Sequence, residues 1–146
     1  MKIISHRGNL NGPDSSIENN PKFIETAVKA GFDVEIDVWY LNNHFYLGHD
    51  NPVYQVSVDW LKTMPLWCHC KNKEALIKLL DNDVHCFWHE SDEVTLTSKN
   101  YIWNYYKNIF STKKSIMVLP EMQENINFNN FYGICTDYPE KYVNLL

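Results

Sequence analysis

Two acidic residues, Glu35 and Asp37, lie two positions apart in an otherwise apolar run. On an extended strand, alternate side chains project from opposite faces, so both carboxylates point one way while Val34, Ile36 and Val38 point the other. Two hard oxygen ligands aimed at one place suit Mg²⁺ or Ca²⁺. A solvated edge strand would also explain acidic residues on one face. The apolar residues between them instead favour a buried strand, where carboxylates are retained mainly when they are paired or bound to a metal.

Two histidines, His6 and His49, each follow a short apolar run. Imidazole gives and takes protons near neutral pH, which makes both residues candidates for acid and base catalysis. Arg7 follows His6 directly and can present two parallel N–H donors to phosphate oxygens, while Lys71 offers a single positive charge. Together these residue types suit an anionic substrate.

The candidate residues lie in or just after predicted strands. Strands are predicted at residues 2–5, 32–40, 44–48, 66–71, 85–89, 115–119 and 132–135, and helices at 21–30 and 73–80. Asn19 fits a helix-capping position before Pro21, and Gly31 fits a left-handed cap after the same helix. Asn42 and Asn43 fit a hairpin turn. Repeated strand and helix units indicate a parallel sheet, whereas residues 92–114 show no clear pattern.

Length and composition indicate one globular domain spanning residues 1–146. The chain is 45% hydrophobic and 14% aromatic, which is enough for one sizeable core. A net charge of -5 argues against a nucleic-acid partner, because binding phosphates needs clustered Lys and Arg. No run approaches the roughly 20 apolar residues of a membrane span, and the chain turns polar too early for a secretory signal. We therefore expect a cytoplasmic protein without integral membrane association.

The four cysteines, Cys68, Cys70, Cys86 and Cys135, lack the density and spacing of a disulfide framework, which fits a reducing compartment. Cysteine and histidine side chains are common zinc ligands, and Cys68-His69-Cys70 places three of them in sequence. In a strand, however, both thiols would face away from the imidazole of His69. Small buried thiols behind the strand are the favoured interpretation.

Four short motifs occur in a fixed order along the chain. They are His6-Arg7-Gly8-Asn9, Glu18-Asn19, Glu35-Ile36-Asp37-Val38 and Gly48-His49-Asp50. In order and spacing they resemble the glycerophosphodiester phosphodiesterase family, within the phospholipase C-like phosphodiesterase superfamily. His69-Cys70-Lys71 aligns with the third strand of that family, which ends in an acidic residue, a spacer and lysine, and residues 133–139 resemble its last strand.

The resemblance implies a fold. Members of the family fold as TIM-type (β/α) barrels, which usually contain about 250 residues. We therefore expect an α/β protein with a shortened TIM-type barrel and abbreviated outer helices, an unusually short member of the family. Such barrels carry their chemistry at the C-terminal ends of the strands, so Glu35, Asp37 and His69 are expected to converge there.

The resemblance also implies a ligand set for a divalent metal. Glu35 and Asp37 correspond to metal ligands, and His69 stands where the family has a third acidic ligand. Mg²⁺ or Ca²⁺ is the expected ion, while the nitrogen of His69 also admits Mn²⁺ or Zn²⁺. Asp92 or Glu121 are alternative sources of the missing oxygen.

By the same resemblance, His6 and His49 form the acid and base pair, and Arg7 and Lys71 bind the substrate phosphate. The implied activity is hydrolysis of a glycerophosphodiester, a small-molecule substrate, to glycerol phosphate and an alcohol. One alternative is phospholipase or sphingomyelinase D-like activity on a lipid phosphodiester. Another is a catalytically degenerate barrel that binds a phosphorylated ligand or a protein partner.

The other aromatic residues receive structural interpretations. His44 and His85 match no motif and are expected to be structural or exposed, while His89 is expected to line the pocket. The five tryptophans are expected in the core, with an aromatic wall for a cationic head group as the alternative.

Overall fold

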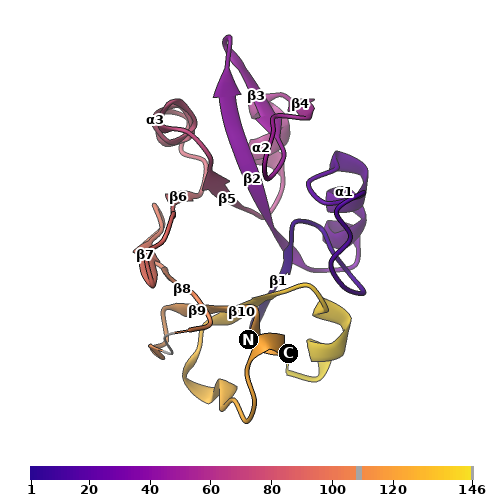
Figure 1. The fold of residues 1–146 in the computed structure, drawn as a ribbon, viewed down its shortest axis with the longest axis vertical. Helices are drawn as coiled ribbons and strands as arrows, with labels where there is room; N and C mark the ends of the chain where they lie inside the picture. The colour runs from indigo at the N-terminus through magenta and orange to yellow at the C-terminus, as the bar shows by residue number, and fades with distance from the viewer. Residues whose placement is uncertain (108–109, 146) are drawn as a thin grey trace.

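The computed structural model describes residues 1–107 and 110–145 as one strongly curled sheet with helices outside it (Figure 1). The described strands are β1 (Lys2–His6), β2 (Asp33–Leu41), β3 (His44–Leu47), β4 (Tyr54–Val56), β5 (Leu66–Cys70), β6 (Cys86–Trp88), β7 (Val94–Leu96), β8 (Ile102–Asn104), β9 (Ser115–Val118) and β10 (Gly133–Thr136). The described helices are α1 (Pro21–Lys29), α2 (Val58–Thr63) and α3 (Lys73–Asp81), with 3₁₀ segments η1 (Pro120–Met122), η2 (Phe128–Asn130) and η3 (Pro139–Leu145).

Parallel strands form the body of the sheet, in the order β8-β9-β10-β1-β2-β5-β6. Three antiparallel pairs are added to it. Strand β7 pairs with β8, and the hairpin β3–β4 pairs with the second half of β2. The sheet is therefore mixed, and the long strand β2 supports both the parallel body and the projecting hairpin.

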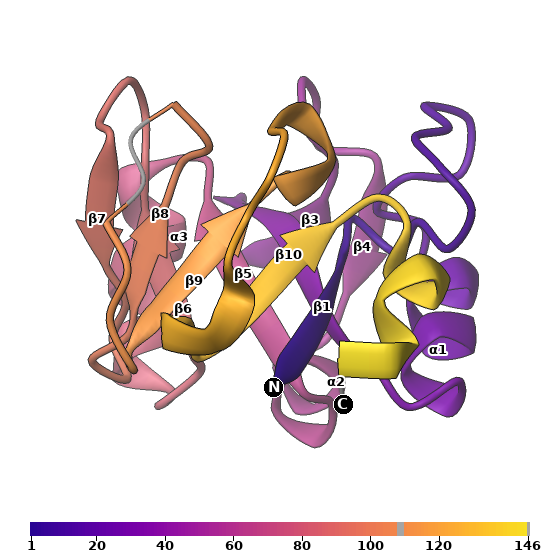
Figure 2. The same ribbon diagram turned by 90° about the horizontal axis from the view of Figure 1, so that it is seen from below.

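The predicted TIM-type barrel is wrong, because helices do not alternate with strands around this sheet. The three described α-helices all lie outside β1, β2, β5 and β6 (Figure 1). Between β9 and β10 the chain makes only the 3₁₀ segments η1 and η2. Figure 2 shows β8, β9, β10 and β1 side by side, with short orange and yellow segments on this side in place of helices. The chain is too short for an outer ring of helices, and the result is a curled, strand-rich half-barrel.

Residues 92–114, whose sequence shows no clear pattern, contain the β7–β8 hairpin and the undescribed residues 108 and 109. Hydrogen bonds tie this hairpin to β6 at the other edge of the sheet. The amide of Ser98 donates to the carbonyl of Cys86 (2.8 Å), and the amide of Cys86 donates to Ser98 Oγ (3.0 Å). Thr95 Oγ1 donates to the carbonyl of Trp88 (2.8 Å). Residues of β6 and β8 can therefore line one cavity.

Alternation along the strands divides the inside of the curled sheet into two layers. The lower layer is apolar and buries Ile4, Trp67, Phe87, Trp103, Ile116, Val118 and Cys135 in one cluster. Two residues further along β1 and β5, the same face carries polar side chains: His6 follows Ile4, and His69 follows Trp67. The apolar layer thus forms a floor beneath the predicted site.

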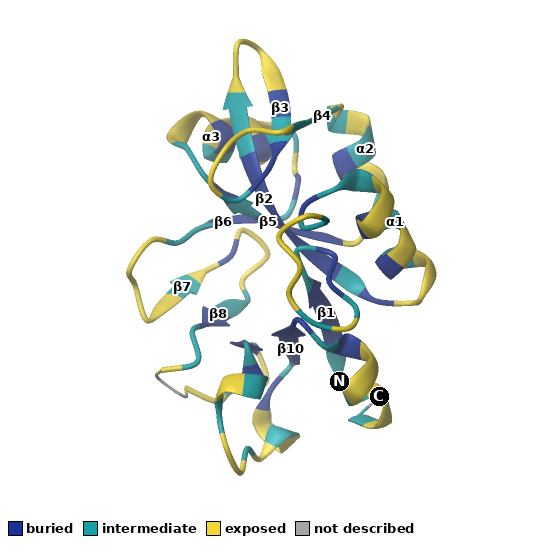
Figure 3. Cartoon of the chain, turned by 45° about the vertical axis from the view of Figure 1, so that its right-hand side comes forward, coloured by how far each residue is buried: buried dark blue, intermediate teal, exposed yellow. Residues whose placement is uncertain are grey.

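The outer face of β2 and β5 packs against the helices. Val34, Ile36 and Val38 are buried there, together with Cys68 and Cys70, as the alternation predicts. Figure 3 shows buried residues on the strands and exposed residues on the outer sides of the helices. The helices predicted at residues 21–30 and 73–80 are confirmed as α1 and α3.

Local chemistry fixes the helix ends. Asn20 caps α1 by accepting a hydrogen bond from the amide of Lys22 (3.0 Å), and Gly31 takes the predicted left-handed conformation, with φ of 95°. Asn72 caps α3 by accepting from the amide of Ala75 (3.1 Å). The same side chain bonds both backbone groups of Tyr40, which ties α3 to β2.

Adjacent leucines in α3 test how the helix packs. Leu79 is fully buried, whereas Leu80 is 51% exposed on the same helix. Leu79→Ala should lower the free energy of unfolding by about 2–5 kcal/mol, because it leaves a cavity against the sheet. Leu80→Ala should change it by less than about 0.5 kcal/mol. Urea denaturation of both variants measures the difference, and equal losses would contradict the packing described for α3.

Candidate functional site

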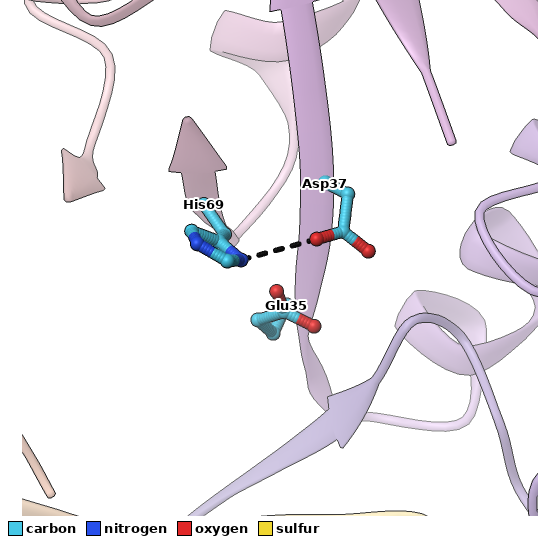
Figure 4. Close-up of side chains that lie close together, drawn as sticks. All are labelled: Glu35, Asp37 and His69. Carbon is cyan, nitrogen blue, oxygen red and sulfur yellow. Dashed lines mark hydrogen bonds and ion pairs between the residues drawn. The ribbon is translucent and has the colours of Figure 1, made fainter. Parts of the chain in front are cut away.

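Glu35, Asp37 and His69 lie close together, with Glu35 and Asp37 on one strand and His69 on its neighbour (Figure 4). One ligand atom from each of the three residues lies within 4.8 Å of the others. Both carboxylates come from one face of β2, and Asp37 is the register partner of His69 on the parallel strand β5. The convergence expected from the sequence is therefore present in the structure.

Asp37 is fully buried and is surrounded by three basic side chains. Its Oδ1 lies 3.1 Å from His69 Nδ1 and 3.5 Å from Lys71 Nζ, and its Oδ2 lies 3.2 Å from Arg7 Nε. Burial opposes ionisation, but the hydrogen bond from His69 and the charges of Arg7 and Lys71 outweigh it and hold the pKa of Asp37 well below its usual value. Asp37 is therefore ionised at neutral pH.

Asn19 clamps the same carboxylate. Its Nδ2 donates to Asp37 Oδ2 (2.9 Å), and its Oδ1 accepts from the backbone amide of Asp37 (2.8 Å). The sequence interpretation of Asn19 as a helix cap was wrong, because Asn20 occupies that position. Asn19 instead positions a predicted metal ligand, and its left-handed backbone, with φ of 60°, turns the side chain toward β2.

Glu35 is the second carboxylate and is only 3% exposed. Its Oε2 has no hydrogen-bond partner within the described residues, and His6 Nε2 is 3.8 Å away. Burial and the nearby charge of Asp37 raise the pKa of Glu35. A buried carboxylate oxygen without a partner is costly. This oxygen therefore fits a cation bound between the two acidic side chains.

The ring of His69 is oriented for ligation. Because a carbonyl only accepts, Nε2 must carry a hydrogen, which it donates to the carbonyl of His89 (2.8 Å). Nδ1 then faces Asp37, where it either donates a second hydrogen or turns its lone pair to a cation. The ring stacks parallel to Phe87, with centroids 5.3 Å apart. A histidine whose second nitrogen donates to a backbone carbonyl matches the usual environment of a metal ligand.

His6 is held by Asp137, which directly follows β10. Its Nδ1 donates to Asp137 Oδ1 (2.8 Å), which also accepts from Asn9 Nδ2 (2.8 Å). Burial disfavours the charged imidazole, but Asp137 and Glu35 outweigh burial and raise the pKa of His6. Asp137 is in turn fixed by Glu121, whose Oε1 accepts from the amide of Asp137 (2.9 Å). His6 Nε2 is left as the ring nitrogen available to a substrate.

No role was predicted for Asp137 from the sequence, although strand alternation indicates on which face its side chain lies. Asp137 follows Cys135 by two residues, as His6 follows Ile4, so alternation alone places its side chain above the apolar floor. Only the pairing of β10 with β1 brings Asp137 next to His6.

Arg7 is positioned by Glu18, which accepts hydrogen bonds from Arg7 Nη1 (3.1 Å) and Asn9 Nδ2 (3.0 Å). The backbone of Arg7 is left-handed, with φ of 53°, so the side chain departs from the strand direction toward Asp37. The loop after β1 is thus ordered by paired charges around the predicted metal ligands.

His49 lies on the loop after β3 and is more exposed than the other site residues, with 40% of its side chain accessible. Its Nδ1 lies 2.7 Å from Asp50 Oδ1. Gly48 precedes it with φ of 146°, and an added Cβ there would meet the carbonyl of Asn51 at 2.0 Å. Glycine is therefore required for the turn that carries His49.

A cavity of about 530 Å³ joins these groups. Its lining includes His6, Arg7, Glu35, His49, His69, Lys71, Trp88, His89, Glu90, Asp92, Trp103 and Tyr105. All predicted site residues except the fully buried Asp37 line it. Asp92 lines the cavity outside the three-residue group, and Glu121 is occupied by Thr136 and Asp137. Neither alternative oxygen ligand therefore joins Glu35, Asp37 and His69.

Comparison with models of protein families, with curated proteins and with solved structures gave no match to this chain. The resemblance to glycerophosphodiester phosphodiesterases therefore stays a prediction based on short motifs. No helix within residues 1–107 or 110–145 is long and apolar enough to cross a membrane.

The raised pKa of Glu35 predicts a pH-dependent stability. In the metal-free protein, Glu35 binds its proton more tightly in the folded state than in the unfolded state. The free energy of unfolding therefore falls as pH rises from the unfolded pKa of about 4.3 through the raised folded pKa. Glu35→Gln should therefore stabilise the protein increasingly over this range and then by a constant amount, about 1 kcal/mol or more.

Urea denaturation in the presence of a chelator over a pH series measures this difference. Glu124→Gln changes an exposed carboxyl group and should show no such trend. A Glu35→Gln effect that shrinks as pH rises would contradict the described environment of Glu35.

Proposed function

We propose that the chain is a metal-dependent phosphodiesterase that converts a small glycerophosphodiester to glycerol phosphate and an alcohol. The observation that carries the proposal is the buried group of Glu35, Asp37 and His69, with one carboxylate oxygen left without a partner. Two cationic side chains, Arg7 and Lys71, border the same cavity. A divalent cation and an anionic substrate together satisfy this arrangement.

Glu35, Asp37 and His69 would hold the cation. Two carboxylates suit Mg²⁺ or Ca²⁺, and the imidazole nitrogen extends the choice to Mn²⁺ or Zn²⁺. A bound cation would neutralise charge on the phosphate oxygens. Asn19 keeps Asp37 in place, and the carbonyl of His89 keeps the ring of His69 in place.

Arg7 and Lys71 would bind the remaining phosphate charge. In the structure, both side chains lie beside the carboxylate of Asp37, and both line the cavity. Arg7 Nη1 donates a hydrogen bond to Glu18, which limits how the guanidinium can turn. Nη2 would then donate to the substrate phosphate.

His6 and His49 would move the protons. A neighbouring hydroxyl on the glycerol part of the substrate would attack phosphorus and form a cyclic phosphate, and the alcohol would leave as its oxygen gains a proton. Water would then open the cyclic phosphate to give glycerol phosphate. The raised pKa of His6 suits the acid, because Asp137 fixes its Nδ1 hydrogen and Nε2 carries the proton to be given. His49, which also lines the cavity, would accept the proton of the attacking hydroxyl.

Metal titration tests the ligand set. In calorimetry with Mg²⁺, Ca²⁺, Mn²⁺ and Zn²⁺ added separately, at least one ion should bind the parent. Asp37→Asn and Glu35→Gln should each lower the affinity for that ion by more than about 100-fold, because loss of a direct ligand has a larger effect than loss of a supporting residue. Asp33→Asn is the matched control, because Asp33 shares the face of β2 but pairs with Lys2. Unchanged binding in both ligand variants would show that the metal binds elsewhere.

Turnover of a panel of glycerophosphodiesters and lysophospholipids tests the catalytic residues. His6→Ala and His49→Ala should each lower kcat by about 10²- to 10⁴-fold while substrate binding survives. Arg7→Ala should weaken both binding and rate, because its charge acts on bound substrate and transition state alike. His44→Ala, which changes an exposed histidine outside the cavity, should leave turnover unchanged.

A parent protein that turns over none of the panel with any metal would exclude hydrolysis of these substrates. If both histidine variants then bound phosphorylated ligands as tightly as the parent does, the result would support a protein that binds such ligands without hydrolysing them.

A further inference from the structure

The side chain of His89 lines the cavity, but the chemistry proposed above gives it no part. The backbone carbonyl of His89 accepts the hydrogen bond from His69 Nε2 (2.8 Å), which holds this residue next to the metal-ligand group. The ring of His89 has its centroid 6.0 Å from the ring of His69 and 6.0 Å from the ring of Tyr105. Backbone and ring contacts therefore fix where the imidazole lies.

The strand register places His89 beside Lys71. Cys70 and Trp88 are the last paired residues of β5 and β6, and Lys71 and His89 directly follow them. Both of these side chains line the cavity. Neighbouring strands lie about 4.8 Å apart, so the ammonium group of Lys71 and the imidazole of His89 can contact the same ligand.

The two ring nitrogens of His89 have different surroundings. Nδ1 is buried and has no hydrogen-bond partner within residues 1–107 and 110–145. Nε2 is not one of the buried nitrogens, and the ring borders the cavity. Nε2 is therefore the nitrogen that a ligand in the cavity can reach.

This difference indicates which nitrogen carries the hydrogen. A hydrogen on Nδ1 would bury an N–H donor without an acceptor, which is unfavourable. A hydrogen on Nε2 leaves only a lone pair unpaired at Nδ1 and presents the N–H group to the cavity. The charged imidazole also carries a hydrogen on Nε2, so this donor is present in both protonation states.

We propose that His89 is a phosphate-binding residue, whose Nε2–H group donates a hydrogen bond to a non-bridging oxygen of the substrate phosphate. The inference rests on the proposed function, which places the phosphate at Arg7 and Lys71 in the same cavity. An ammonium group acts on phosphate as a point charge, whereas the N–H group of an imidazole donates along one direction. His89 would therefore orient the phosphate that Lys71 attracts.

Two carboxylates near the cavity do not prevent this contact. Glu90 and Asp92 line the cavity, but both are exposed, so water and salt screen their charges. His89 itself is half-buried. A hydrogen bond from a partly buried N–H group to an anionic phosphate oxygen is stronger than one between neutral groups.

Nuclear magnetic resonance of the nitrogen-labelled, Mg²⁺-containing protein tests the donor without turnover. The neutral ring of His89 should carry its hydrogen on Nε2, and saturating glycerol 3-phosphate should shift the Nε2 resonance more than the Nδ1 resonance. A hydrogen on Nδ1 in the neutral ring would overturn the proposal. An Nε2 resonance that does not respond to bound glycerol 3-phosphate would also overturn it.

Matched variants test the hydrogen bond by calorimetry with glycerol 3-phosphate. His89→Phe keeps a ring without the donor and should lower the affinity by about 10- to 100-fold. His89→Gln supplies an amide N–H group near the position of Nε2 and should restore part of the affinity. His44→Phe, which changes an exposed histidine outside the cavity, is the control. Parent-like affinity in His89→Phe, or equal losses in His89→Phe and His89→Gln, would overturn the role of the hydrogen bond.

Metal binding distinguishes this role from a structural one. Because the backbone carbonyl of His89 holds His69, both His89 variants should bind the metal as tightly as the parent does. A loss of metal affinity in His89→Phe as large as the loss of phosphate affinity would overturn the assignment, since it would show that the metal-ligand group had moved.

Turnover separates this inference from the function on which it rests. Hydrolysis of glycerophosphodiesters with equal kcat/KM in the parent and His89→Phe would overturn the role of His89 and leave the phosphodiesterase intact. Absence of hydrolysis, with glycerol 3-phosphate bound more weakly by His89→Phe than by the parent, would support phosphate binding by His89 and remove the phosphodiesterase.

Discussion

The burial of two carboxylates on one strand face is the constraint on which the site depends. Glu35 and Asp37 are both nearly inaccessible to water, and the charge of Asp37 is balanced by Arg7 and Lys71. Glu35 receives no comparable balance, because the imidazole of His6 is its nearest basic group at 3.8 Å. Two buried anions would be unfavourable alone, so the loop after β1 and the end of β5 must both deliver cations to β2. A divalent ion would complete this balance.

Period-two alternation connects this constraint to the rest of the fold. Strands β1 and β5 each contribute an apolar residue to the floor and, two positions later, a polar residue to the site. Ile4 and His6, Trp67 and His69 follow this rule. A slip of one residue in the pairing of β2 with β5 would turn Asp37 away from His69 and toward the helices. The apolar floor and the polar site are therefore specified together by the strand register.

Much of the local structure can be predicted from the sequence. Alternation in β2 places Glu35 and Asp37 on one face, and the same rule separates the thiols of Cys68 and Cys70 from His69, because both effects depend only on neighbouring residues. The barrel prediction was wrong because it transferred the helices of larger proteins to segments that make only a hairpin and 3₁₀ turns. The roles of Asn19 and Asp137 could not be predicted, since each depends on contacts across the sheet: Asn19 reaches Asp37, and Asp137 reaches His6 only because β10 pairs with β1.

The most direct test is the coordination of the metal by His69 itself. Pulsed electron paramagnetic resonance of the Mn²⁺-loaded protein detects an imidazole nitrogen bonded to the ion, independently of any activity. His69→Glu should keep a metal site, since it supplies an oxygen ligand in place of the nitrogen. If Glu35, Asp37 and His69 hold the metal, the parent shows a directly bound nitrogen and His69→Glu shows none. A parent without a bound nitrogen, or a nitrogen signal that survives in His69→Glu, would contradict the proposed metal centre.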